Sequence, residues 1–164
     1  MQSLFRSFVL ILVLTYSTGL IAQTKQEVFS SLEKIIKRAD GQKVEARGLV
    51  KPDKVTKQQF NESFVAVATK NTAKNSTESS YTFSEIPWAE LYKYTIDQDD
   101  ANDDVYEVTM YFDKHLKTTY RSDYNGEGEH DKTIFINVYI RTKDFNDFDR
   151  QIKLLGTVIP NKIR

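Results

Sequence analysis

The chain has 164 residues, of which 23 are basic and 23 are acidic, and it contains no cysteine. The missing cysteines exclude disulfides, zinc–thiolate sites, thiol nucleophiles and a lipid-modified cysteine. The balanced charge argues against general nucleic-acid binding, which needs a net basic surface.

The first 22 residues have the layout of a secretory signal. Arg6 supplies a positive start, Phe8–Tyr16 is a short apolar run, and Leu20-Ile21-Ala22 precedes a polar chain. The run is shorter than the ~20 residues that cross a bilayer, so cleavage after Ala22 is favoured over a membrane anchor, although Leu20 fits the cleavage pattern poorly. We therefore expect a periplasmic or secreted protein with no membrane span after cleavage and one mature domain over residues 23–164.

Residues 24–39 are predicted to form a helix. Thr24 and Glu27 match a capping box, and Gly41 suits the left-handed residue that follows a helix end. Apolar residues recur at helical spacing between these signals, at Val28, Leu32, Ile35, Ile36 and Ala39.

From Lys43 onward the apolar period changes to two, which predicts strands. The expected strands are residues 44–50, 60–69, 81–86, 88–96, 105–112, 118–121 and 132–141. Polar segments between them are expected to be turns or loops, at residues 51–54, 70–80, 97–104 and 122–131. In the last strand one apolar face is expected, made by Ile134, Ile136, Val138 and Ile140.

The chain is predicted to close with an amphipathic helix over residues 144–155, ended by Gly156. Its apolar stripe consists of Phe145, Phe148, Ile152 and Leu155. A sheet with one apolar face needs a cover, and the two helices can supply it. The predicted fold class is therefore α+β, with an N-terminal helix, an antiparallel sheet or partly closed barrel of six to seven strands, and a C-terminal amphipathic helix.

The final strand and helix, Ile134–Ile140 followed by Phe145–Leu155, resemble the end of a pleckstrin-homology-like barrel. The segment Phe83-Ser84-Glu85-Ile86-Pro87-Trp88 followed by Leu91 is similar to that superfamily as well. The resemblance covers residues 43–155 and rests on pattern, without a diagnostic motif. It implies a curved seven-stranded sheet plugged by a helix, and a protein that binds peptides or lipids more often than it catalyses. Because no basic loop of the phosphoinositide type is evident, a lipid-head-group role is not carried over.

Two clusters invite a metal. The acidic run Asp97–Asp104 could hold calcium, but it lacks the glycine and glutamate of an EF-hand loop, so a solvated hairpin turn is favoured. His130 lies among acidic residues without the spacing of a metal site, and a surface loop is favoured there. Because nucleophile and phosphate-loop motifs are also missing, the sequence predicts no catalytic residue, no metal site and no cofactor.

Aromatic side chains provide the candidate binding residues. Trp88, Tyr92 and Tyr94 lie close together in the sequence, and Tyr92 and Tyr94 are expected on one face of a strand. Tyr120 and Tyr124 are expected to flank a loop. Exposed rings at this density could form a surface for a ligand or partner, while sheet packing is the alternative explanation for any single ring.

Three functions remain open at this point. The leading hypothesis is a non-catalytic secreted or periplasmic domain that binds a protein, peptide or apolar ligand through its curved sheet. The alternative is a hydrolase of envelope or extracellular polymer that acts through paired carboxylates. The third is an assembly factor of the cell envelope.

Overall fold

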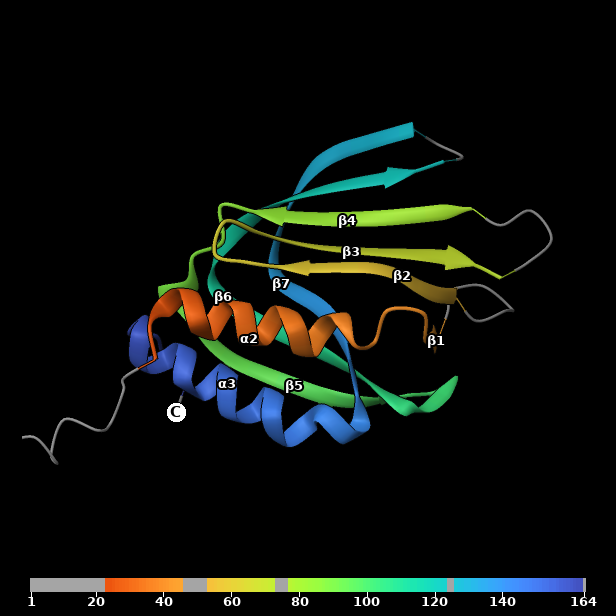
Figure 1. Cartoon of the computed structure of the whole chain (residues 1–164). Helices are drawn as coiled ribbons and strands as arrows, with labels where there is room; N and C mark the ends of the chain where they lie inside the picture. Colours follow the sequence, from red (N-terminus) through yellow and green to blue (C-terminus); the bar gives the residue numbers. More distant parts are fainter. Residues whose placement is uncertain (1–22, 46–52, 73–76, 124–125, 164) are drawn as a thin grey trace, which may run out of the picture.

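The computed structural model describes residues 23–45, 53–72, 77–123 and 126–163, with the backbone alone for residues 126–131. Two helices pack against one curled antiparallel sheet in an α+β fold (Figure 1). The predicted order of helix, strands and closing helix is thereby confirmed. The expected export segment, residues 1–22, lies outside the described residues. Within the described ranges, no helix combines the length and hydrophobicity of a membrane span.

Helix α2 (Lys25–Lys37) begins at the predicted cap. The Thr24 hydroxyl accepts a hydrogen bond from the Glu27 amide at 3.2 Å, and the Thr24 amide donates to the Glu27 carboxylate at 2.7 Å. Both contacts satisfy amides that a helix start leaves without partners. After the helix, Gly41 has a φ of +86°, a conformation that glycine adopts without steric cost.

Within the described residues the sheet has seven antiparallel strands in the order β1-β2-β3-β4-β6-β5, and β7 pairs with β6 off this path. Their bounds are β1 (Lys43–Val44), β2 (Asp53–Phe60), β3 (Phe64–Asn71), β4 (Glu78–Ser84), β5 (Leu91–Asp99), β6 (Asn102–Ser122) and β7 (Gly126–Arg141).

Strand β6 has 21 residues and pairs with β4, β5 and β7. Its first half pairs with β5 and its second half with β4, while β7 pairs with both halves. Between the halves, the register against β7 shifts between Tyr111 and Leu116, and irregularities of this kind bend a strand. The short helix η1 (Trp88–Glu90) joins β4 to β5 at the same corner. The sheet therefore has two parts that meet at a bend.

The bend brings β7 back toward β2, and the side chain of Gln58 joins the two strands. Gln58 is completely buried. Its amide nitrogen donates to the carbonyls of Tyr139 and Ile36, both at 3.0 Å, and its oxygen accepts from the Tyr139 amide at 2.8 Å. One carboxamide therefore links β2, β7 and the end of α2, and it satisfies backbone groups that burial would otherwise leave unpaired.

Helix α3 (Phe145–Val158) follows η2 (Thr142–Asp144) and packs against α2. It buries Phe148, Ile152 and Leu155 as predicted, while Phe145 is partly exposed. The predicted end at Gly156 is wrong, because the helix continues to Val158. Gly156 has a different role: a Cβ there would lie 3.0 Å from the Asn161 side-chain oxygen, so a larger residue would require the Asn161 side chain to shift by a few tenths of an ångström.

The first hairpin differs most from the sequence prediction. Asp53 and Lys54, expected in a turn, begin β2, and the expected strand 60–69 is broken by a turn between β2 and β3. In that turn the Asn61 side chain accepts from the amides of Ser63 and Phe64 at 2.9 and 3.0 Å. The sequence pattern does not predict strand β2, because its central core position is the polar Gln58, which interrupts the apolar alternation.

The loops predicted between the other strands are also longer than the loops in the structure. Strands β3 and β4 extend into residues 70–80, β5 and β6 extend into residues 97–104, and β7 begins at Gly126 inside the expected loop 122–131. Trp88, expected in a strand, lies in η1. In β7, Ile136, Val138 and Ile140 are buried as predicted, but Ile134 is exposed opposite the irregular part of β6.

We predict that Gln58→Met destabilises the protein by about 3 kcal/mol, because a thioether of similar length leaves two carbonyls and one amide without their partner. The matched control is Gln59→Met on the neighbouring, half-buried position, for which a change within about 0.5 kcal/mol is expected. Urea unfolding followed by circular dichroism measures both values. Equal losses for the two variants would contradict the closing role of Gln58.

Candidate ligand-binding surface

The three aromatic residues singled out from the sequence do not form one surface. Trp88 lies in the core, where its ring contacts those of Phe29, Phe60 and Phe112 at centroid distances of 5.2–5.8 Å. Its indole nitrogen donates to the Glu62 carbonyl at 2.8 Å. Trp88 thus joins α2, the first hairpin and β6 at the corner of the sheet.

Tyr92 and Tyr94 face opposite sides of the sheet, so the expectation of a shared face is wrong. The register of β5 against β6 shifts between Leu91 and Lys93, which makes Tyr92 an extra residue and cancels the two-residue alternation. Tyr92 lies beside Tyr111, whose ring also contacts the Lys93 ammonium. Tyr94 instead packs edge-on against Phe148 of α3.

The Tyr94 hydroxyl binds a charge on α3. It donates to the Asp149 carboxylate at 2.5 Å, and Lys153 contacts the other oxygen of that carboxylate at 2.7 Å. Hydrogen bonds from Lys153 and Tyr94 lower the pKa of Asp149. Burial, together with the bond to Asp149, raises the pKa of Tyr94. This hydrogen bond connects α3 to β5, so Tyr94 has a structural role.

The acidic run does not act as one solvated turn, since Asp99 is buried. Its carboxylate accepts from the Glu45 amide at 2.9 and 3.1 Å and from the Ala101 amide at 3.0 Å. Asp99 therefore fixes the β5–β6 turn and the residue after β1. Across the described ranges, no group of three or more His, Asp or Glu side chains is arranged to hold a metal. The side chain of His130 lies outside the described part.

A charged cluster fixes the C-terminal segment to the sheet corner. Lys162 contacts Glu90 at 2.7 Å and Asp113 at 2.5 Å, Lys114 contacts Glu90 at 2.8 Å, and the Lys162 amide donates to the Leu91 carbonyl at 3.0 Å. Hydrogen bonds from Lys114 and Lys162 lower the pKa of Glu90 to about 2. Bonds to Asp113 and Glu90 raise the pKa of Lys162 to about 12. Glu90 and Lys162 therefore stay charged across the physiological range.

The strand register defines an aromatic surface on the core-facing side of the sheet. Residues directly opposite in antiparallel strands point to the same face. Phe83, which is buried, shares its face with Tyr81 two residues earlier on β4, and Tyr81 pairs with Tyr120 on β6. Tyr81 is 46% exposed. We name the set Tyr81, Phe83, Tyr120, Ser79 and Thr118 the inner aromatic patch.

The rings of the inner aromatic patch contact one another. The centroids of Tyr81 and Tyr120 lie 4.9 Å apart, and those of Tyr81 and Phe83 lie 6.5 Å apart with nearly parallel planes. The hydroxyls of Ser79 and Tyr120 are 3.2 Å apart. The β4 residues that begin the strand extend past the end of α2 (Figure 1). The core-facing side of the sheet is therefore partly exposed to solvent at Tyr81.

The inner aromatic patch consists of aromatic rings and a few hydroxyl groups. It combines the ring faces of Tyr81 and Tyr120 with the hydroxyls of Ser79 and Tyr120, while Phe83 and Thr118 are buried. Pockets for ligands have this composition: mostly apolar, with a few polar groups that fix orientation. The five residues include no carboxylate, histidine or lysine for acid–base chemistry.

The sequence alone did not single out Tyr81. Its signal was the alternation Ser79, Tyr81, Phe83 along one strand, which assigns two rings and a hydroxyl to one face. The polar composition of residues 70–80, which predicts a loop, hides that signal. Comparisons with protein-family models, with curated proteins and with solved structures found no match.

We predict that Tyr94→Phe lowers stability by about 1 kcal/mol at pH 7, because it removes one hydrogen bond to a carboxylate. An acid whose pKa is lowered by folding stabilises the native state above its unfolded pKa, and this stabilisation is lost as the pH falls through the folded pKa. The difference between variant and wild type should thus shrink below about pH 4. Urea unfolding between pH 7 and pH 2.5 tests this, and a constant difference at every pH would refute it.

Proposed function

We propose that this protein is a non-catalytic binding domain that holds an extended peptide or another partly apolar ligand on the inner aromatic patch. The observation that carries the proposal is Tyr81, which is nearly half exposed although its neighbours on the same face form the core. The Tyr81 ring packs against Tyr120 and Phe83, and its exposed part leaves apolar surface in contact with water. Aromatic residues in such positions commonly anchor partners.

The patch offers two kinds of contact to a ligand. The faces of Tyr81 and Tyr120 can cover apolar or aromatic groups, and the hydroxyls of Ser79 and Tyr120 can donate to carbonyl oxygens. A peptide supplies both groups in alternation, as does a small amphipathic molecule. Nucleic acid is not proposed as a ligand of this patch, since its five residues carry no basic side chain.

The fold supports the same assignment. A curled antiparallel sheet with a C-terminal helix is compatible with the pleckstrin-homology-like barrel suggested by residues 43–155, and we extend the proposal to that superfamily. Helix α2 lies outside the resemblance. Fold alone does not establish function, so the proposal depends on the patch.

A hydrolase would need an acid with a raised pKa beside a second carboxylate. Burial raises the pKa of Asp40, while the neighbouring Gln58 and the charges of Lys37 and Lys57 act in the opposite direction. The groups that act on Asp40 are thus an amide and two lysines. Glu90 is held ionised by lysines and is unsuited to donate a proton at neutral pH. Both observations favour binding over hydrolysis.

We include export in the proposal, on the strength of the charge, apolar run and small residue within residues 1–22. A protein outside the cytoplasm that lacks cysteine has to rely on its own core for stability. The 26 buried apolar side chains among the described residues are consistent with that requirement.

We predict that ligand binding depends on Tyr81 and Tyr120. The probe is the tightest dodecapeptide obtained by selecting a random displayed library against the mature protein. Replacing both rings, in Tyr81→Ser/Tyr120→Ser, should weaken its binding at least about tenfold, because aromatic anchors each contribute more than ~1 kcal/mol. Titration calorimetry measures the affinities.

The matched control is Tyr92→Ser, which removes an exposed tyrosine from the opposite face of the sheet. It should leave the peptide affinity within about twofold. Selection of peptides that bind Tyr81→Ser/Tyr120→Ser as tightly as wild type would exclude the inner aromatic patch.

We predict that the full chain, expressed in a bacterium with a Sec system, is recovered outside the cytoplasm with Gln23 as its first residue. The variant Ala22→Phe should block cleavage, because the position before the cut requires a small side chain. Intact-mass spectrometry of the periplasmic and membrane fractions reads out both results. Recovery of uncleaved wild-type chain from the cytoplasm would contradict export.

A further inference from the structure

The outer face of the first strands carries lysines in direct register. Lys43 on β1 is opposite Lys54 on β2, and Lys54 is opposite Lys70 on β3. All three are exposed, and neighbouring strands lie ~4.8 Å apart. The three lysines therefore form a ladder across three strands that spans about 10 Å.

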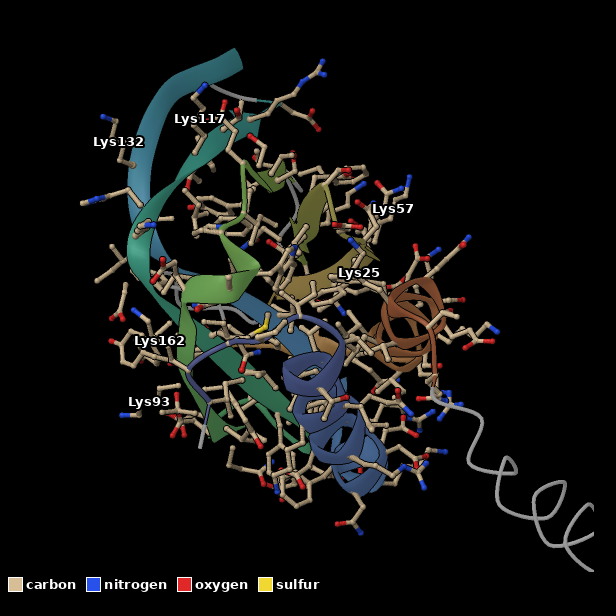
Figure 2. All side chains as sticks on the ribbon, turned by 90° about the vertical axis from the view of Figure 1, so that its left-hand side faces the viewer. Lys25, Lys57, Lys93, Lys117, Lys132 and Lys162 are labelled. Atoms are coloured by element: carbon tan, nitrogen blue, oxygen red, sulfur yellow. The ribbon has the colours of Figure 1, made fainter. Side chains whose placement is uncertain are left out.

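Two further cations continue this face. Lys57 is opposite Ala68, which is opposite Ser80, which in turn is opposite Arg121 on β6. Lys57 and Arg121 thus stand at the two ends of one row and are both exposed. We name the set Lys43, Lys54, Lys57, Lys70 and Arg121 the basic face. Figure 2 shows Lys57 on the outside of the β2 side, far from Lys117 and Lys132 on the β6 and β7 side.

The basic face is poorly neutralised. Among the described residues, none of its five cations forms an ion pair with a carboxylate. Glu78 is opposite Lys70 on β4, and the charge of Asp40 interacts with that of Lys57, so these two carboxylates offset part of the charge. Like charges directly opposite in a sheet are destabilising. Repulsion between the facing lysines therefore lowers the stability of the fold. Binding of an anionic partner would offset this repulsion.

Between the cations lies a strip of short side chains. Ala66 and Ala68 on β3 are opposite Thr82 and Ser80 on β4, and all four are half-buried. The long side chains of Lys57 and Arg121 flank this strip from β2 and β6. A linear chain can lie on the strip with its charges directed at the lysines and its hydroxyls at Ser80 and Thr82.

From this arrangement we propose that the basic face binds an acidic polysaccharide, a linear sugar chain that bears carboxylates or sulfates. Single-stranded nucleic acids are usually held by aromatic platforms for their bases, and the strip contains no aromatic side chain. Anionic membranes are entered by apolar side chains next to the basic ones, whereas this strip offers alanine and hydroxyls. The surface lies on the opposite side of the sheet from the inner aromatic patch, so the two proposals stand independently.

The test measures binding of the mature protein to polygalacturonate by titration calorimetry at low salt. The variant Lys54→Gln/Lys57→Gln/Lys70→Gln removes three charges from the basic face and keeps similar side-chain lengths. We expect about tenfold weaker binding, from the combined loss of three exposed ion pairs. The matched control Lys34→Gln/Lys93→Gln/Lys143→Gln changes the net charge equally, at exposed lysines elsewhere, and should bind within about twofold of wild type.

Unfolding of the variant does not obscure the result. Removal of facing like charges should leave the thermal midpoint unchanged or slightly higher, which circular dichroism checks. Equal weakening by the two triple variants, or no binding by wild type, would overturn the proposal. Tighter wild-type binding to oligothymidylate or to phosphatidylglycerol vesicles than to polygalacturonate would overturn the polysaccharide assignment.

Discussion

A single buried carboxamide holds the curled sheet closed. An antiparallel sheet that bends back on itself brings the backbone edge of one strand into its own core, where unpaired amides and carbonyls are costly. Gln58 meets that cost at Tyr139, where it accepts from the amide and donates to the carbonyl. Its second amide hydrogen binds Ile36 at the end of α2. The hydrogen bonds to Tyr139 replace those that a neighbouring strand would make. Because Gln58 also binds the end of α2, the curvature of the sheet and the position of this helix depend on the same side chain.

The two faces of the curled sheet carry the two surfaces to which we assign function. On the inside, α2 and α3 pack against the sheet and α3 buries Phe148 and Leu155 there, while Tyr81 beside Tyr120 is partly exposed. On the outside, β1, β2 and β3 present their lysines in register over short neighbours. A flat and fully covered sheet would bury the first surface. The proposed peptide site therefore depends on this curvature, whereas the proposed polysaccharide site depends on the pairing register of β1, β2 and β3.

The sequence predicted the elements whose signals are local. The cap formed by Thr24 and Glu27 located the start of α2, and the alternation in residues 105–112 and 134–140 located the first half of β6 and the second half of β7. What it missed depends on contacts distant in sequence. A glutamine in the core gives β2 a polar pattern, and the extra residue Tyr92 reverses the alternation in β5. Neither effect is visible before the strands are paired. The prediction that Tyr92 and Tyr94 share one face of the sheet was wrong for the same reason. In a strand with a bulge, the pairing with the neighbouring strand decides which face a side chain occupies.

The most direct test of this account is amide hydrogen exchange at Tyr139, measured residue by residue by NMR. Tyr139 lies on β7, and its amide points away from β6 toward the Gln58 oxygen, 2.8 Å away. If the carboxamide closes the sheet, this amide exchanges as slowly as those of Val138 and Ile140, with a protection factor near that of global unfolding. Fast exchange at Tyr139 while Val138 and Ile140 stay protected would show that the edge of β7 is open and would contradict the account.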